Sequence, residues 1–248
     1  MRIRASSPSI AVLSLIFLVT ALVRAHADEI EIRTPDGIVL RGTYRKADGD
    51  GTRAALLLHM LGKTRKDYEP LETLLLEKGI STFAFDFRGH GDSTKKASGE
   101  EINYRSFDDR TWPDVVKDIS PALSFLESHG HKRQDITIVG ASIGANAAIV
   151  ASSRDLQIRT VVLLSPGMNY RTLRIEDAVT AWDKRPMLVM ATDGDTYAAT
   201  TAQKIRDLLS KNTKVTVTLF PGFNAHGTAL FDGVPGSTQK IADWIADH

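Results

Sequence analysis

The chain contains no cysteine and carries almost no net charge. Without cysteine, disulfides, thiolate zinc sites, iron–sulfur clusters and a cysteine nucleophile are excluded. Lys and Arg number 31 against 30 Asp and Glu, which gives a formal charge of +1. The cationic excess with which proteins neutralise phosphates is therefore missing, and we expect no nucleic-acid partner. The 248 residues, 42% of them hydrophobic, suffice for one globular domain with an apolar core.

The first 27 residues have the three-part pattern of an export signal. Arg2 and Arg4 form a basic start, and an apolar run at residues 10–23 follows that is too short to span a bilayer comfortably. Ala25-His26-Ala27 offers small residues for cleavage. We therefore expect a signal peptide over residues 1–27 and an exported domain over residues 28–248, periplasmic or secreted, without a stable membrane span. An uncleaved anchor is the alternative.

Short apolar runs alternate with helical patterns along the remaining chain. Residues 29–33 and 38–44 flank an Asp-Gly pair, which predicts an antiparallel hairpin. Continuous apolar runs, typical of strands buried on both faces of a parallel sheet, occur at residues 54–59, 81–87, 135–140, 160–164, 187–191 and 215–220. Helices are predicted at residues 68–78, 112–128, 143–153, 198–211 and 237–246. The pattern predicts a doubly wound, mostly parallel α/β sheet with its site at the carboxyl ends of the strands.

A Gly-x-Ser-x-Gly segment, Gly140-Ala141-Ser142-Ile143-Gly144, stands between a predicted strand and a predicted helix. Such a segment forms a strained turn that projects the serine hydroxyl above the sheet, and glycine two residues away on either side avoids collisions. A serine hydroxyl needs a base and an orienting acid. Asp193, Asp195 and His226 follow later strands and complete the chain order Ser, Asp, His.

These motifs resemble those of the α/β-hydrolase superfamily, and the similarity extends from the opening hairpin to the final helix. Two further segments support it, His59-Met60-Leu61-Gly62 and Asp86-Phe87-Arg88-Gly89-His90-Gly91. The resemblance implies acyl transfer to water with no metal and no cofactor. In that reaction His226 removes the proton of Ser142, Ser142 attacks a carbonyl, and Asp195 orients the imidazole.

The resemblance also implies an oxyanion hole of two backbone N–H groups. One is the N–H of Ile143, directly after the nucleophile. The other comes from the first segment, which in the family usually reads His-Gly-x-Gly, whereas Met60 replaces the first glycine here. Leu61 is therefore the first choice of donor and Met60 the second.

Two acids compete for the orienting role, because Asp193 and Asp195 lie in the same loop. Asp193-Gly194 is a good turn pair whose carboxylate can cap the turn, which favours Asp195. Asp86 is a weaker alternative, since the resemblance gives its motif, with Arg88 and His90, a structural role.

Other histidines are interpreted as structural. His59 ends the strand before the oxyanion segment and is expected to hold loops beside the site. His129 and His131 follow a predicted helix, where a solvated helix end is the simplest interpretation.

The substrate pocket has the weakest signal in the sequence. Only residues 165–186 separate two strand candidates, and a short helix near residues 173–182 uses most of them. We therefore expect no large cap and an open site for a small or exposed acyl group. Met168, Tyr170 and Trp182 are candidates for the pocket lining; ordinary packing of the short helix on the sheet is the alternative.

The sequence thus predicts an exported serine hydrolase that acts on a small-molecule carboxylic ester. Peptide or amide hydrolysis, as in the serine aminopeptidases that share this fold, is an alternative with the same chemistry. A dienelactone-hydrolase-like activity is another, although its nucleophile is usually cysteine. A binding protein that keeps the fold without turnover is the alternative from a different class. The sequence does not determine the oligomeric state.

Overall fold

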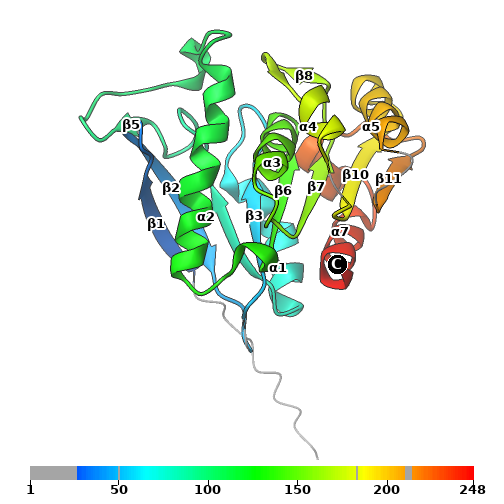
Figure 1. The fold of residues 1–248 in the computed structure, drawn as a ribbon, viewed down its shortest axis with the longest axis horizontal. Helices are drawn as coiled ribbons and strands as arrows, with labels where there is room; N and C mark the ends of the chain where they lie inside the picture. Colours follow the sequence, from blue (N-terminus) through cyan, green and yellow to red (C-terminus); the bar gives the residue numbers. More distant parts are fainter. Residues whose placement is uncertain (1–26, 50, 183, 210–213) are drawn as a thin grey trace, which may run out of the picture.

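The computed structural model describes residues 27–49, 51–182, 184–209 and 214–248, so the predicted signal peptide lies outside the described residues except for Ala27. Within these residues one nine-stranded sheet runs through the molecule (Figure 1). Its strand order is β1-β2-β4-β3-β6-β7-β10-β11, with β5 paired to β2. The strands are β1 (Ala27–Arg33), β2 (Ile38–Arg45), β3 (Ala54–Leu58), β4 (Ser81–Phe85), β5 (Lys95–Lys96), β6 (Ile136–Ala141), β7 (Thr160–Leu164), β10 (Met187–Thr192) and β11 (Val215–Phe220).

The sheet is antiparallel at one end and parallel elsewhere. β1 pairs antiparallel with β2, and β2 pairs antiparallel with β4. From β4 through β3, β6, β7 and β10 to β11 every neighbouring pair is parallel. The predicted doubly wound α/β sheet with an N-terminal hairpin is therefore confirmed.

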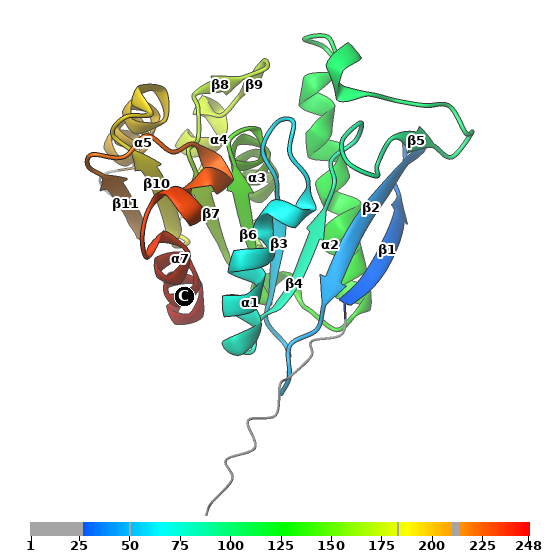
Figure 2. The ribbon, with the colours of Figure 1, turned by 180° about the vertical axis from the view of Figure 1, so that it is seen from behind.

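Helices cover both faces of this sheet, as Figures 1 and 2 show from opposite sides. α1 (Glu69–Glu77) and α7 (Ser237–Asp247) pack on one face; α2 (Ile119–Ser128), α3 (Ile143–Arg154) and α5 (Thr196–Leu208) pack on the other. β3 contributes to both cores, because Leu56 and Leu58 face one layer of helices and Leu57 faces the other. Burial on both sides explains why the central strands β3, β4, β6, β7 and β10 are continuous, mostly apolar runs in the sequence.

The segment between β7 and β10 differs from its prediction. In place of one helix near residues 173–182 it forms a small hairpin, β8 (Asn169–Tyr170) and β9 (Leu173–Arg174), followed by α4 (Glu176–Thr180). The side-chain amide of Asn146 donates to the carbonyl oxygens of Gly167 and Leu173, at 2.8 Å each. These carbonyls thus find a long-range partner, which replaces the local hydrogen bonds of a helix. The segment is too short for a large cap, as expected.

The interpretation of His131 as part of a solvated helix end was wrong. Its side chain is buried, with Nε2 at 2.9 Å from the Tyr44 hydroxyl and Nδ1 at 3.0 Å from the carbonyl oxygen of Thr52. After α2 the chain passes close to the end of β2, where the imidazole forms hydrogen bonds with the Tyr44 hydroxyl and the carbonyl oxygen of Thr52. His129 is exposed.

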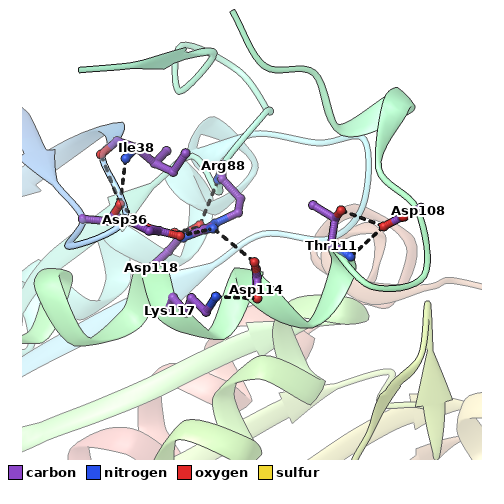
Figure 3. Close-up of polar contacts among 9 residues, drawn as sticks. Asp36, Ile38, Arg88, Asp108, Thr111, Asp114, Lys117 and Asp118 are labelled. Atoms are coloured by element: carbon purple, nitrogen blue, oxygen red, sulfur yellow. Dashed lines mark hydrogen bonds and ion pairs between the residues drawn. The ribbon is translucent and has the colours of Figure 1, made fainter. Parts of the chain in front are cut away.

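A buried ion-pair network holds the loop after β4. The Arg88 guanidinium binds two carboxylates at 2.7 Å each, the buried one of Asp118 and the partly exposed one of Asp36 (Figure 3). Asp36 belongs to the β1–β2 turn and Asp118 to the 3-10 helix Trp112–Asp118. Arg88 therefore ties three segments together, in agreement with its interpretation as a structural residue.

In the part of the chain that the structure describes, no helix is long and apolar enough to cross a membrane.

Candidate active site

Ser142 occupies a strained turn between β6 and α3. Its φ and ψ are 53° and −116°, a conformation that a residue with a side chain adopts only when its surroundings enforce it. Its N–H donates to the carbonyl oxygen of Leu164 on the neighbouring strand at 2.8 Å. A Cβ atom at Gly144 would lie 2.3 Å from the carbonyl oxygen of Leu58. Glycine is thus required for α3 to approach β3 closely enough to hold this turn.

His226 and Asp195 come together from the loops after β11 and β10. Nδ1 of His226 lies 2.5 Å from Oδ2 of Asp195. The other oxygen of Asp195 accepts the N–H of Ala198 in the first turn of α5 at 3.3 Å, which fixes the carboxylate. Asp193 points elsewhere and accepts the N–H of Gly222 at 3.0 Å. Of the two competing acids, Asp195 contacts the imidazole.

Side chains from two other strands hold the His226 loop in place. The hydroxyl of Thr192 accepts the N–H of Ala225 at 3.2 Å and lies 3.1 Å from its carbonyl oxygen. The hydroxyl oxygen of Ser165 accepts the N–H of Gly227 at 3.0 Å. The residues on either side of His226 are therefore tied to the ends of β10 and β7, beside the turn that holds Ser142.

A pocket of about 310 Å³ opens at this place. It is lined by Met60, Leu61, Ser142, Ile143, Tyr170, Arg171 and His226. A larger cavity of about 740 Å³ lies between the end of β2 and α1 and contains none of the predicted site residues.

In the described part of the chain, no group of three or more acidic, histidine or cysteine side chains is arranged to hold a metal ion.

Two of the three residues proposed for the pocket lining lie outside it. Trp182 is buried in the apolar core, and its Nε1 donates to the carbonyl oxygen of Arg185 at 3.0 Å. Met168 packs against the same core, with its N–H directed to the hydroxyl of Thr201 at 3.2 Å. Their packing against the sheet agrees with the alternative interpretation. Tyr170 does line the pocket.

The segment after β3 directs one backbone N–H away from its own turn. The carbonyl oxygen of Met60 accepts from Nδ1 of His59 at 2.8 Å and from the N–H of Lys63 at 3.2 Å. Because no peptide bond in the described residues is cis, the N–H of Leu61 points opposite to this carbonyl. In the described residues neither this N–H nor that of Ile143 donates to another protein group. Both residues line the pocket, so both donors are available to a ligand.

His59 is a neutral bridge beneath the site. Its Nε2 accepts the N–H of Phe87 at 2.9 Å, so Nδ1 carries the proton that it donates to Met60. Complete burial lowers the pKa of His59 to about 4. Asp86 is also buried, where its oxygens accept the N–H groups of Arg65 at 2.7 Å and Asp92 at 2.9 Å. Neither side chain lines the pocket, and both hold loops next to it.

Tyr170 lies against both reactive groups. Its ring is perpendicular to that of His226, with the ring centroids 6.0 Å apart. Burial raises the pKa of Tyr170, the negative charge of Asp195 raises it further, and a hydrogen bond with the side chain of Ser142 acts in the opposite direction. The phenol therefore stays protonated and can donate a hydrogen bond beside the nucleophile.

Two residues at the site were missed by the sequence interpretation. Arg171 lines the pocket from the β8–β9 turn, and Asn146 anchors that hairpin from α3, one turn after Ser142. The two residues of the β8–β9 turn are Arg171 and Thr172, so the Asn or Gly that usually predicts a hairpin turn is missing from it. Asn146 gave one usable signal, because an amide within an otherwise small and apolar buried helix needs hydrogen-bond partners.

Comparisons with known proteins identify the family and the fold of this chain. A family model described as serine aminopeptidase, S33, matches residues 51–218, more than half of the chain. No curated protein sequence matches significantly. Among solved structures, an esterase of Pyrococcus furiosus superposes with a TM-score of 0.72 at 19% identity, covering 90% of this chain and 93% of its own.

Two further structures show the same fold. A dienelactone hydrolase from Anabaena variabilis has a TM-score of 0.67 at 19% identity, with 90% of this chain and 96% of that chain covered. An esterase from Exiguobacterium antarcticum has a TM-score of 0.65 at 12% identity, with 88% and 99% covered. The chain belongs to the serine aminopeptidase S33 family of hydrolases and has the α/β-hydrolase fold.

Proposed function

We propose that this hydrolase is an exported serine esterase in which Ser142, His226 and Asp195 form a catalytic triad. The observation that carries the proposal is the contact of 2.5 Å between His226 Nδ1 and Asp195 Oδ2, beside a pocket that both Ser142 and His226 line. A carboxylate on Nδ1 selects the tautomer whose Nε2 is free to accept a proton. The strained turn at Ser142 is further support, since such turns expose a nucleophile.

The proposed reaction has two halves. Nε2 of His226 takes the proton of the Ser142 hydroxyl as its oxygen attacks the ester carbonyl, and the N–H groups of Leu61 and Ile143 stabilise the oxyanion. We choose the N–H of Leu61 over that of Met60, because the two hydrogen bonds accepted by the carbonyl oxygen of Met60 direct the N–H of Leu61 away from their turn. His226 then protonates the leaving alkoxide. Water, activated by the same imidazole, releases the acid and restores Ser142.

The pocket favours an ester over an aminoacyl amide. A free α-ammonium group needs a carboxylate to bind it. The residues that line the pocket include no acid, and Arg171 is one of them. Asp195, the acid beside the pocket, is already engaged by His226 and by the N–H of Ala198. The charge at the site therefore disfavours the family's aminopeptidase activity for this chain.

The proposal is tested by intact-mass spectrometry of the exported protein before and after a fluorophosphonate probe. The expected result is one adduct, which Ser142→Ala abolishes together with hydrolysis of p-nitrophenyl acetate, while Ser98→Ala, a change in an exposed loop serine, leaves both unchanged. The mass of the unlabelled protein reports whether cleavage follows Ala27. A folded protein without adduct or turnover would contradict the esterase and favour a binding protein with this fold.

A further inference from the structure

The turn between β8 and β9 has a costly backbone conformation. Tyr170 pairs with Leu173, so that the turn consists of Arg171 and Thr172 alone. Their φ angles are 48° and 65°, in the left-handed region that such two-residue turns require. Asn and Gly adopt this region readily, whereas a β-branched threonine does so rarely. Backbone strain of this kind persists where the surroundings enforce it, and it is frequent at ligand-binding sites.

Contacts with a segment far away in the sequence maintain this conformation. The hydroxyl of Thr172 lies 2.6 Å from the carbonyl oxygen of Asp109. The guanidinium of Arg171 lies over the indole of Trp112, 5.7 Å from its centroid. Trp112 is buried, so the indole offers a fixed surface to the cation. The turn thus holds the Arg171 side chain beside the pocket at a defined place.

The positive charge of Arg171 is not neutralised by the protein. Among the described residues no carboxylate oxygen lies within 4.0 Å of its guanidinium nitrogens. Asp108, in the contacting segment, uses its carboxylate to accept the N–H of Thr111 (Figure 3) and the N–H of Arg110. The buried Arg88, by contrast, has two carboxylate partners at 2.7 Å. A cation without a counter-ion beside a pocket lined mostly by apolar side chains attracts an anion.

We propose that Arg171 binds a carboxylate on the substrate, so that the enzyme prefers esters of short dicarboxylic acids over neutral esters of the same size. This inference rests on the proposed esterase function. A guanidinium presents two parallel donors that match the two oxygens of a carboxylate. The pocket holds about 310 Å³, and Arg171 and Ser142 both line it, so only a few bonds separate the carboxylate from the scissile carbonyl.

The test compares two esters that differ in a single group. Monomethyl succinate and methyl levulinate have the same chain, and a carboxylate oxygen in the first is replaced by a methyl group in the second. Their hydrolysis is followed by proton release. For the wild type, kcat/KM is expected to be about tenfold or more higher for monomethyl succinate, in the range of a charge-assisted hydrogen bond. This advantage should shrink as salt is added.

Arg171→Gln should bring kcat/KM for monomethyl succinate down to the value that the same variant has for methyl levulinate, and labelling of Ser142 by the fluorophosphonate probe shows that the variant is folded. Arg174→Gln is the matched control, since Arg174 is exposed on the same hairpin and lies outside the pocket lining. It should retain the wild-type preference. Equal values for the two esters in the wild type, or an unchanged preference in Arg171→Gln, would overturn the inference and leave the esterase intact. Absence of both labelling and turnover would overturn the two together.

Discussion

The imidazole of His226 meets Asp195 at 2.5 Å, whereas Asp193, two residues earlier in the same loop, binds the backbone of Gly222. Asp195 also begins α5, so its carboxylate is held by the helix as well as by the histidine. Asp193 instead joins the loops after β10 and β11. Of the two carboxylates in this loop, Asp195 contacts the imidazole and Asp193 connects two loops.

Replacing these two acids separately should give opposite results. Asp195→Asn is expected to lower kcat for ester hydrolysis by about 10⁴-fold. The amide oxygen keeps the N–H of Ala198, so the amide NH2 faces Nδ1 as a donor and favours the wrong tautomer of His226. Asp193→Asn should change kcat by less than about threefold and lower stability slightly. Steady-state kinetics of the two variants measure both effects. A larger loss in Asp193→Asn would assign the orienting role to the other acid.

Substitutions of Tyr170 and Trp182 should also have different effects, one on activity and the other on stability. Tyr170→Phe removes the phenol hydroxyl, which donates to the carbonyl oxygen of Ser165 at 3.4 Å in the pocket that Ser142 lines, and kcat/KM should fall by about tenfold with little change in stability. Trp182→Phe shrinks a buried side chain outside the pocket, and should lower the free energy of unfolding by about 1–2 kcal/mol while kcat/KM stays near the wild-type value. Kinetics and urea unfolding of both variants separate the two roles. Full activity in Tyr170→Phe would show that the phenol hydroxyl takes no part in the reaction.

The Arg88 network should respond strongly to the loss of its buried carboxylate. Asp118→Ala removes the one fully buried carboxylate of the network and leaves the buried guanidinium of Arg88 with Asp36 and Asp114, which are both partly exposed. The free energy of unfolding should therefore fall by about 3 kcal/mol. Asp114→Ala is the matched control, because Asp114 is partly exposed and lies 3.9 Å from Arg88 (Figure 3). Its loss should stay within about 1 kcal/mol. Similar losses in urea unfolding for the two variants would show that burial does not decide the energy of this network.

The buried histidine below the site makes stability depend on pH. The pKa of His59 is about 4 in the folded protein and near 6.5 when unfolded, so the unfolded chain binds the extra proton between these values. Stability from the neutral imidazole is fully present above pH 6.5 and is lost as pH falls toward 4, with a slope of up to about 1.4 kcal/mol per pH unit.

This pH effect is measured by urea unfolding at pH 7 and pH 5. His59→Gln should lower stability at pH 7, since glutamine only partly replaces the two hydrogen bonds, and should lose less than the wild type between the two pH values. The exposed His129, replaced by Gln, should leave the slope unchanged. An equal slope in His59→Gln and the wild type would mean that another group, such as the buried His90, whose pKa is also lowered to about 4, dominates the acid response.

Local patterns were sufficient for the sheet and for the residues that follow its strands. The boundaries of β7 and β11 coincide with their predictions. β7 is buried on both faces, as its continuous apolar run predicts. β11 is an edge strand that is only partly buried, and its alternating Val and Thr residues mark its length. The position of Ser142 between a strand and a helix followed in the same way, since glycine spacing acts within a few residues. Chain order alone placed Asp195 and His226 in loops at one edge of the sheet.

Long-range packing decided what chain order left open. Asp195 rather than Asp193 meets His226 because two loops dock through Thr192 and Gly222. A hairpin replaces the predicted helix because its carbonyls bind Asn146, far away in the chain. Trp182 is buried in the core. Arg171 lines the pocket, and its guanidinium lies over the indole of Trp112. Periodicity records how a residue relates to its neighbours along the chain, whereas burial and ion pairing depend on partners that only the folded chain brings near.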